Sequence, residues 1–152
     1  MKLRPLMAMR AHLRQPADVV GDVPLGQRMI SEVTDGSFEG ERLRGRLVGP
    51  GADWITVGAG GIAHVDVRVT LETDDAALIY MQYLGKLLFD ENVAAAVAQG
   101  RATELGDTYF MTQPRFETGS AKYAWLNGVV AVAEGRLIEN GVEYQVFECL
   151  HG

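Results

Sequence analysis

Acidic and basic side chains alternate with valines along residues 62–73, where Asp66 and Arg68 are two positions apart. In an extended strand, residues two apart point to the same face and lie roughly 6.6 Å from each other. The carboxylate and the guanidinium could therefore contact one ligand together. A carboxylate can accept a proton from a substrate, and a guanidinium can stabilise the negative charge that then develops. The segment therefore allows acid–base chemistry.

The polar face of this strand has more than one interpretation. In a sandwich, Val65 and Val67 would face the core, and Asp66 and Arg68 would be solvated. In a ligand-holding barrel the polar row can line the cavity, and the valine face then packs on a helix or another subunit. A third alternative is a satisfied internal ion pair that fixes the register of the barrel.

Aromatic and polar residues gather in the second half of the chain. Glu117 and Asn127 are polar residues close in sequence to the large aromatic residues Tyr123 and Trp125, and Tyr80 alternates with apolar neighbours. Small-molecule pockets combine apolar walls with a few polar groups in this way. The alternative for each aromatic residue is ordinary core packing.

Composition excludes several classes of protein. The chain of 152 residues fits one domain, and its formal net charge of −6 argues against nucleic-acid binding, which needs clustered Lys and Arg. No stretch approaches the ~20 apolar residues of a membrane span, and the N-terminus lacks a signal-peptide pattern. We expect a soluble cytoplasmic protein without a nucleic-acid or membrane partner.

Motifs for metals and cofactors are also missing from the sequence. His12, His64 and His151 are dispersed, without the spacing of a metal site. The glycines at 58–61 lack the Lys-Ser/Thr of a phosphate-binding loop. Cys149 lies in an apolar run and is expected to be a buried thiol. We therefore predict no metal and no cofactor, so any catalysis would be acid–base work by side chains.

Turn signals at short spacing, among them TDGSFEG at 34–40, predict an all-β fold. Asn140-Gly141 predicts a hairpin with a type I′ turn, and Asp74-Asp75 predicts another hairpin. Residues 90–100 are Ala-rich, with Asp90 as N-cap and Gly100 after the last turn, and predict a short helix at about 90–99. The predicted strands are 5–13, 25–34, 41–48, 53–57, 62–73, 76–85, 107–118, 122–134 (with a possible break) and 142–150.

Three stretches of the chain resemble one family: TDGSFEGERLRGRLVGPGADW, VDVRVTLETDDAALIYMQYLG and YFMTQPRFETGSAKYAWLNG. The family is domain of unknown function 3237, also called uncharacterised protein family 0311, and the resemblance extends from Leu6 to Glu148. Two positions depart from its pattern: Ala76 replaces a glycine after the Asp pair, and His64 stands where an acidic residue is common.

The resemblance implies a compact, closed or nearly closed antiparallel β-barrel of calycin or lipocalin type, formed by residues 1–152. Because Asp66 and Arg68 match motif positions, it favours the barrel lumen for both side chains. The other residues that we expect to bind or convert a ligand there are Asp53, Trp54, His64, Tyr80, Thr112, Glu117, Tyr123, Trp125 and Asn127.

Two functions fit such a cavity. One is a cofactor-free lyase, isomerase, hydratase or cyclase that acts on a small aromatic or polyketide-like compound. The other is a carrier or sensor that uses the cavity for binding alone, and a purely structural partner protein is a weaker third idea. In the enzyme, Asp66 or Glu117 would be the base, Tyr80 the acid, Arg68 the stabiliser of an anion, and Trp54 and Trp125 the stacking walls.

A polar lumen would leave an apolar surface on the outside of the barrel. If Asp66 and Arg68 point inward, the face with Val65, Val67 and Val69 points outward, and an exposed apolar patch commonly marks an interface. We therefore expect a homodimer.

Overall fold

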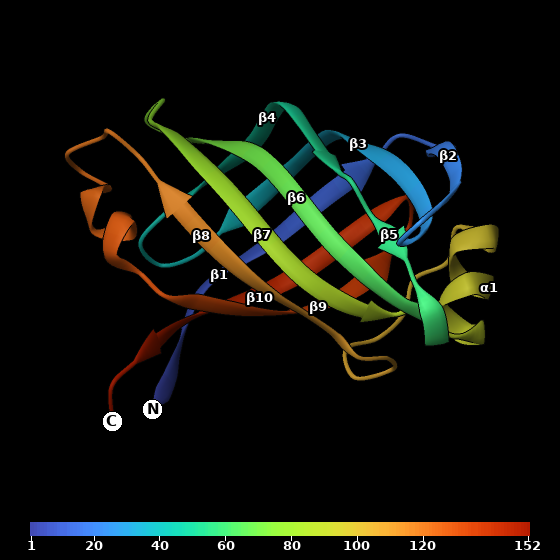
Figure 1. The fold of residues 1–152 in the computed structure, drawn as a ribbon. Helices are drawn as coiled ribbons and strands as arrows, with labels where there is room; N and C mark the ends of the chain where they lie inside the picture. Colours follow the sequence, from blue (N-terminus) through green and yellow to red (C-terminus); the bar gives the residue numbers. More distant parts are fainter.

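The structure is a computed structural model that describes residues 1–152, and antiparallel strands dominate it. A ten-stranded sheet curls into a ring with one α-helix at one end (Figure 1). The elements are β1 (Lys2–Leu13), β2 (Asp18–Val23), β3 (Gly26–Glu39), β4 (Arg44–Asp53), β5 (Thr56–Val57), η1 (Ala59–Gly61), β6 (Ile62–Thr73), β7 (Leu78–Leu88), α1 (Glu91–Gln99), β8 (Phe110–Glu117), η2 (Ala124–Gly128), β9 (Ala131–Ile138) and β10 (Gly141–Leu150).

The ring closes where the first strand meets the third. Neighbouring strands follow the order β1-β10-β9-β8-β7-β6-β4-β3-β2, and β1 pairs with β3 in addition to β10. The pairing between β8 and β9 is short: these strands pair only at Met111–Glu134 and Thr112–Ala133. The predicted antiparallel, barrel-like fold with one short helix is therefore confirmed.

The valine face of β6 forms part of the core. Val65, Val67 and Val69 are at most 3% exposed and point into the ring, whereas Asp66 and Arg68 alternate with them and point outward. The expectation that Asp66 and Arg68 line the lumen is therefore wrong. The physical reason is that apolar side chains fill most of the interior of this narrow ring, so the apolar face of the strand turns inward.

Glycines in the motif G-x-F-E-G allow the ring to close. We interpreted residues 34–40 as a turn, but β3 continues through them to Glu39 and pairs with β1. A Cβ atom at Gly36 would lie 2.2 Å from the carbonyl oxygen of Arg10, and one at Gly40 would lie 2.0 Å from that of Leu6. Between these glycines, Phe38 is 1% exposed and fills the core.

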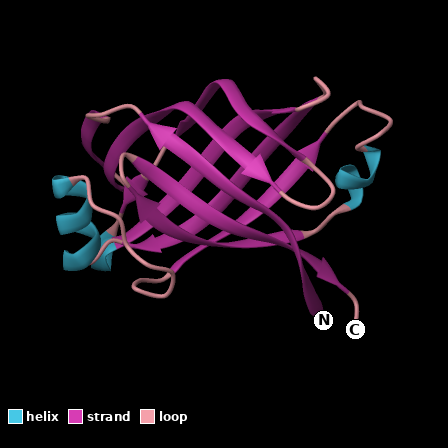
Figure 2. Cartoon of the chain, turned by 180° about the vertical axis from the view of Figure 1, so that it is seen from behind, coloured by secondary structure: helices cyan, strands magenta, loops and turns pink.

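The two ends of the ring are covered differently (Figure 2). Helix α1 covers one end, with the Asp90 side chain accepting a hydrogen bond from Val93 N–H and Gly100 in the left-handed conformation, as predicted. The short 3₁₀ helix η2 covers the other end and buries Leu126 completely. No helix of the chain is long and apolar enough to span a membrane.

Both predicted hairpins are present, with one difference in turn geometry. Strands β6 and β7 pair around Asp74-Asp75, and Ala76, which replaces the expected glycine, adopts a φ of 67°. In the β9–β10 hairpin, Gly141 already pairs with Ile138, and only Asn140 has a positive φ of 54°. The predicted type I′ turn at Asn140-Gly141 is therefore wrong, because such a turn needs a positive φ at both residues.

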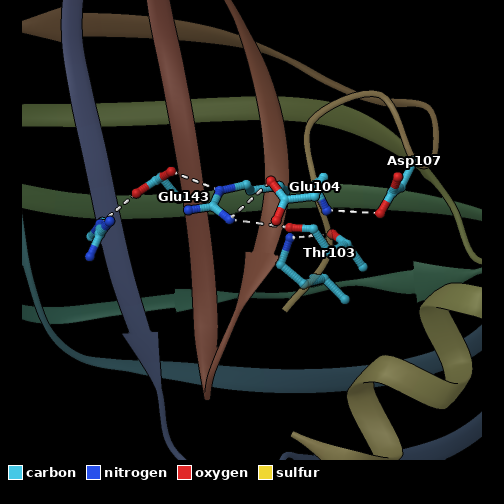
Figure 3. Close-up of polar contacts among 7 residues, drawn as sticks. Thr103, Glu104, Asp107 and Glu143 are labelled. Carbon is cyan, nitrogen blue, oxygen red and sulfur yellow. Dashed lines mark hydrogen bonds and ion pairs between the residues drawn. The ribbon is translucent and has the colours of Figure 1, made fainter. Parts of the chain in front are cut away.

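The segment between α1 and β8 is anchored to β9 (Figure 3). Thr103 exchanges backbone and side-chain hydrogen bonds with Leu137, and its carbonyl accepts from Arg136. Arg136 donates to Glu143 at 2.8 Å, and Arg10 also donates to Glu143, which joins β9, β10 and β1. These contacts fix the segment that follows α1 to the edge of the ring at β9.

Candidate functional site

An apolar cavity of about 160 Å³ lies inside the ring at the end covered by α1. We call it the lumen cavity. Asp53 and Ser31 are polar residues of its wall, and Gln15 and Arg101 belong to its lining as well. The apolar residues of the lining include Leu13, Met29, Ile55, Val65, Leu87, Phe89, Ala96, Val97, Phe110, Leu137 and Val142.

The strand register directs Asp53 into this cavity. Asp53 on β4 pairs with Val67 on β6 and with Ser31 on β3, and residues that pair across strands point to the same face. Since Val67 is 2% exposed in the core, Asp53 also points inward. Its Oδ1 accepts a hydrogen bond of 3.1 Å from the backbone N–H of Asp66.

The surroundings of Asp53 favour its neutral form. Burial raises the pKa of its carboxyl from 3.8 to about 6, the Asp66 N–H lowers it, and the nearby Asp66 carboxylate raises it. A carboxyl with a pKa near 6 is largely ionised at neutral pH, yet it is a stronger base than an ordinary carboxylate. Asp53 is therefore suited to accept a proton.

Two buried tyrosines, Tyr83 and Tyr144, lie near Asp53 in the interior of the ring. The rings of Tyr83 and Tyr144 meet edge to face with centroids 5.2 Å apart, and Phe110 packs on Tyr144 in the same way. Burial raises the pKa of both tyrosines, and the charge of Asp53 raises each further. The tyrosines therefore stay protonated at neutral pH, and both lie close enough to Asp53 to be affected by its charge.

Tyr83 and Tyr144 were not among the predicted site residues. The available signal was their phase: each is a polar aromatic residue on the apolar face of an alternating strand. Asp53 was expected to bind a ligand, and the structure places it in the lumen cavity. Thr112 also points inward and is 2% exposed, beside Gly85.

The residues predicted to be catalytic lie on the outside of the ring. The side chains of Asp66 and Arg68 are 38% and 48% exposed, with Oδ1 and Nη1 3.9 Å apart. Tyr80 pairs across strands with Glu117, and both are exposed. The structure therefore does not bring these four residues into a common lumen site.

Trp54 and His64 belong to the outer surface as well. Both line an external groove, and the Arg68 guanidinium lies 5.8 Å from the centre of the Trp54 ring. His64 pairs across strands with Lys86 and contacts its Nζ.

The remaining predicted binding residues stabilise the end of the ring opposite α1. The Tyr123 hydroxyl donates to Asp75 at 2.8 Å, and the Arg42 guanidinium stacks on Trp125 at 4.1 Å. The Asn127 amide accepts from the backbone N–H of Thr118 and donates to its carbonyl. Tyr123, Trp125 and Asn127 therefore connect η2 to the ring, and the expectation that Trp125 and Asn127 share a cavity with Asp66 is wrong.

We predict a small effect for Asp66→Asn. Its Oδ1 is buried without a hydrogen-bond partner and lies 3.9 Å from Nη1 of Arg68, whose side chain is 48% exposed. Long pairs with an exposed partner contribute about 0–1 kcal/mol, so little attraction is lost when the carboxylate becomes an amide. Thermal melts should show stability within about 1 kcal/mol of the wild type. A fall of several kcal/mol would mean that the pair is a structural element after all.

The fold and its lumen cavity define a class of ring-like, β-barrel-like proteins. The chain matches the family described as "Protein of unknown function (DUF3237)" over residues 1–149. It therefore belongs to this family, as the sequence motifs predicted. The UPF0311 protein RPA1785 of Rhodopseudomonas palustris is 29% identical over 106 residues, which cover 70% of this chain and 69% of that protein.

Solved structures show the same fold. A β-barrel-like protein of Acinetobacter baumannii AYE, ABAYE2633, is 37% identical with a TM-score of 0.82, covering 97% of this chain and 94% of its own. The crystal structure of RPA1785 gives 25% identity and a TM-score of 0.87, with 98% and 97% covered. A structure described as an enzyme from Penicillium herquei shares the fold at 22% identity and a TM-score of 0.67, with 97% and 92% covered.

Proposed function

We propose that the lumen cavity binds a small organic molecule and that Asp53 removes a proton from it without a cofactor. The observation that carries this proposal is a carboxyl with a pKa of about 6 in the wall of an apolar cavity. Perturbed carboxyls in apolar clefts are typical of acid–base sites. The reaction class is that of an isomerase, lyase, hydratase or cyclase, each of which can begin with proton removal beside a carbonyl.

The cavity favours a compact, largely apolar ligand. Its volume of about 160 Å³ is similar to that of apolar cavities that bind benzene. One ring of an aromatic or polyketide-like compound fits such a space, with its remainder at the mouth. The ligand would enter beside Gln15, Val97 and Arg101, because these are exposed residues of the lining.

Ser31 is positioned to assist Asp53. The two residues pair directly across β3 and β4, and both line the cavity. Side chains of directly paired residues start about 5 Å apart, so one ligand can contact both. When Asp53 removes a proton beside a carbonyl, the Ser31 hydroxyl can donate to the oxygen on which negative charge develops.

A carrier or sensor is the second candidate. Asp53 is the only carboxylate in the lining, and the apolar walls alone would hold a ligand. A carrier needs shape and orientation, whereas the enzyme needs the base. Loss of the Asp53 carboxylate would therefore remove the activity of the enzyme, whereas a carrier would still bind its ligand.

Proton removal can be tested with a carbon acid of suitable size. We expect the wild type to accelerate exchange of the α-protons of 2-indanone in D₂O, followed by NMR. Asp53→Asn should lower this acceleration by at least about a hundredfold, since positioned bases contribute 10²–10⁴-fold. Glu117→Gln removes an exposed carboxyl on the outside of β8, away from the lumen cavity, so it is the control and should exchange like the wild type.

The outcomes distinguish the candidates. Binding of 2-indanone without faster exchange would support a carrier. Exchange that persists in Asp53→Asn would contradict the role of Asp53, and no binding at all would contradict the lumen site.

A further inference from the structure

The outside of β7, β8 and β9 carries an apolar groove that nothing within the chain covers. We call it the outer groove; its volume is about 770 Å³. Leu84 is 53% exposed and Met111 40% exposed, both in its lining. Further apolar residues of the lining are Leu3, Val132 and Phe147. Contiguous exposed apolar surface of this kind commonly marks an interaction site.

Charges of opposite sign lie on the two sides of Met111. Lys86 on β7 pairs with Met111 on β8, and Met111 pairs with Glu134 on β9. The three side chains therefore form one row, in which the cation and the anion are two strands, or roughly 10 Å, apart. Both charged residues line the outer groove.

Neither charge is neutralised within the chain. The ion pairs of the structure do not include Lys86 or Glu134. The Lys86 ammonium contacts only the His64 ring. A partner that presents an anion opposite Lys86 and a cation opposite Glu134 would therefore complement this face.

We propose that a second copy of the chain covers the outer groove, related by a two-fold axis that runs along β8. Such an axis exchanges the two sides of β8, so β7 of one copy faces β9 of the other. Lys86 then faces the partner's Glu134, Glu134 faces the partner's Lys86, and Met111 contacts its own equivalent. The face is self-complementary, as a two-fold interface requires.

The neighbouring row of side chains across β7, β8 and β9 is also self-complementary. Leu84 on β7 pairs with Gln113 on β8, and Val132 lies two residues before Glu134 on the same face of β9. The same axis therefore places Leu84 near the partner's Val132, so apolar residues meet apolar residues. A homodimer was expected from the sequence, but through the Val65–Val67–Val69 face, which is buried in the core. The outer groove replaces that face in the proposal.

Charge reversal tests this arrangement by sedimentation equilibrium. The wild type should be a dimer, and Lys86→Glu or Glu134→Lys alone should weaken it at least about tenfold, because each reversal creates two like-charge contacts per dimer. An equal mixture of the two variants should recover the wild-type affinity as a heterodimer, in which both contacts again join opposite charges. Glu139→Lys, an exposed residue beyond the end of β9, is the matched control and should leave the dimer unchanged.

Other results would overturn the proposal. These are a wild type that stays monomeric at 100 μM (roughly the upper range of such an experiment), single reversals that dimerise like the wild type, or a mixture that does not recover. Circular dichroism of each variant establishes that it is folded. A mixture that recovers dimerisation also requires that both variants are folded.

Discussion

Replacing Asp53 with Asn is expected to stabilise the protein by up to about 3 kcal/mol above pH 6 and to leave its stability nearly unchanged well below pH 3.8. Burial raises the pKa of the Asp53 carboxyl from 3.8 in an ordinary environment to about 6 in the fold. That difference corresponds to about 3 kcal/mol of destabilisation when the carboxyl is ionised. Asn has nearly the shape of the neutral carboxyl, never ionises, and can still accept from Asp66 N–H.

The direction of the pH dependence follows from proton binding. Well below pH 3.8 the carboxyl is protonated in both the folded and the unfolded chain, so ionisation costs nothing. Between pH 4 and pH 6 the folded chain binds the proton and the unfolded chain does not, so the wild type loses stability as pH rises. Above pH 6 the loss is complete and constant.

Urea unfolding of the wild type and Asp53→Asn at about pH 3 and at pH 8 measures this difference. We expect nearly equal midpoints at the acidic pH and a higher midpoint for the variant at pH 8. A variant that is less stable at pH 8 would mean that the ionised carboxylate stabilises the fold, and Asp53 would then be a structural residue. Greater stability together with lost proton exchange is the pattern expected of a functional group that costs stability.

Replacing Gly36 with Ala is expected to destabilise the protein by about 3 kcal/mol, because the ring then closes poorly. The new methyl group would meet the Arg10 carbonyl oxygen at 2.2 Å and a Leu47 methyl at 3.0 Å. Strands β1 and β3 would have to move apart at the pairing that closes the ring. For a chain of this size, such a loss lowers the Tm by roughly 10 °C.

Gly119→Ala is the matched control for this closure. A Cβ atom at Gly119 meets nothing within 4 Å, so its Tm should remain within about 2 °C of the wild type. Calorimetry of both variants gives the comparison. Equal Tm values for Gly36→Ala and the wild type would show that β1 and β3 do not approach each other as closely as described.

The fold could be predicted from local patterns to a large extent. Residues 62–73 alternate strictly and form β6 with those same bounds, and Asp90 and Gly100 mark the ends of α1. The turn predicted at 34–40 is wrong. Glycine and aspartate are typical of turns, but here Gly36 and Gly40 allow the backbones of neighbouring strands to approach closely. Only the pairing of β3 with β1, which are separated in sequence, reveals that role.

The candidate site was less predictable. Alternation along β6 separates two faces but does not say which one is inside, and the family motif led us to place Asp66 and Arg68 there. The motif residues Tyr123, Trp125 and Asn127 turned out to fasten η2 to the ring. Asp53 was recognised as a ligand-binding residue, but its raised pKa comes mainly from burial in the folded ring, which the sequence around it does not reveal.

The proposed chemistry requires that the Asp53 carboxyl accepts protons inside the lumen cavity near neutral pH. NMR titration of the carboxyl carbon of Asp53, assigned by its absence in Asp53→Asn, measures this most directly. The structure predicts a pKa of about 6, and 2-indanone should change it when it fills the cavity. A pKa at or below the ordinary value of 3.8 that does not respond to 2-indanone would mean that Asp53 is not the base of a lumen site.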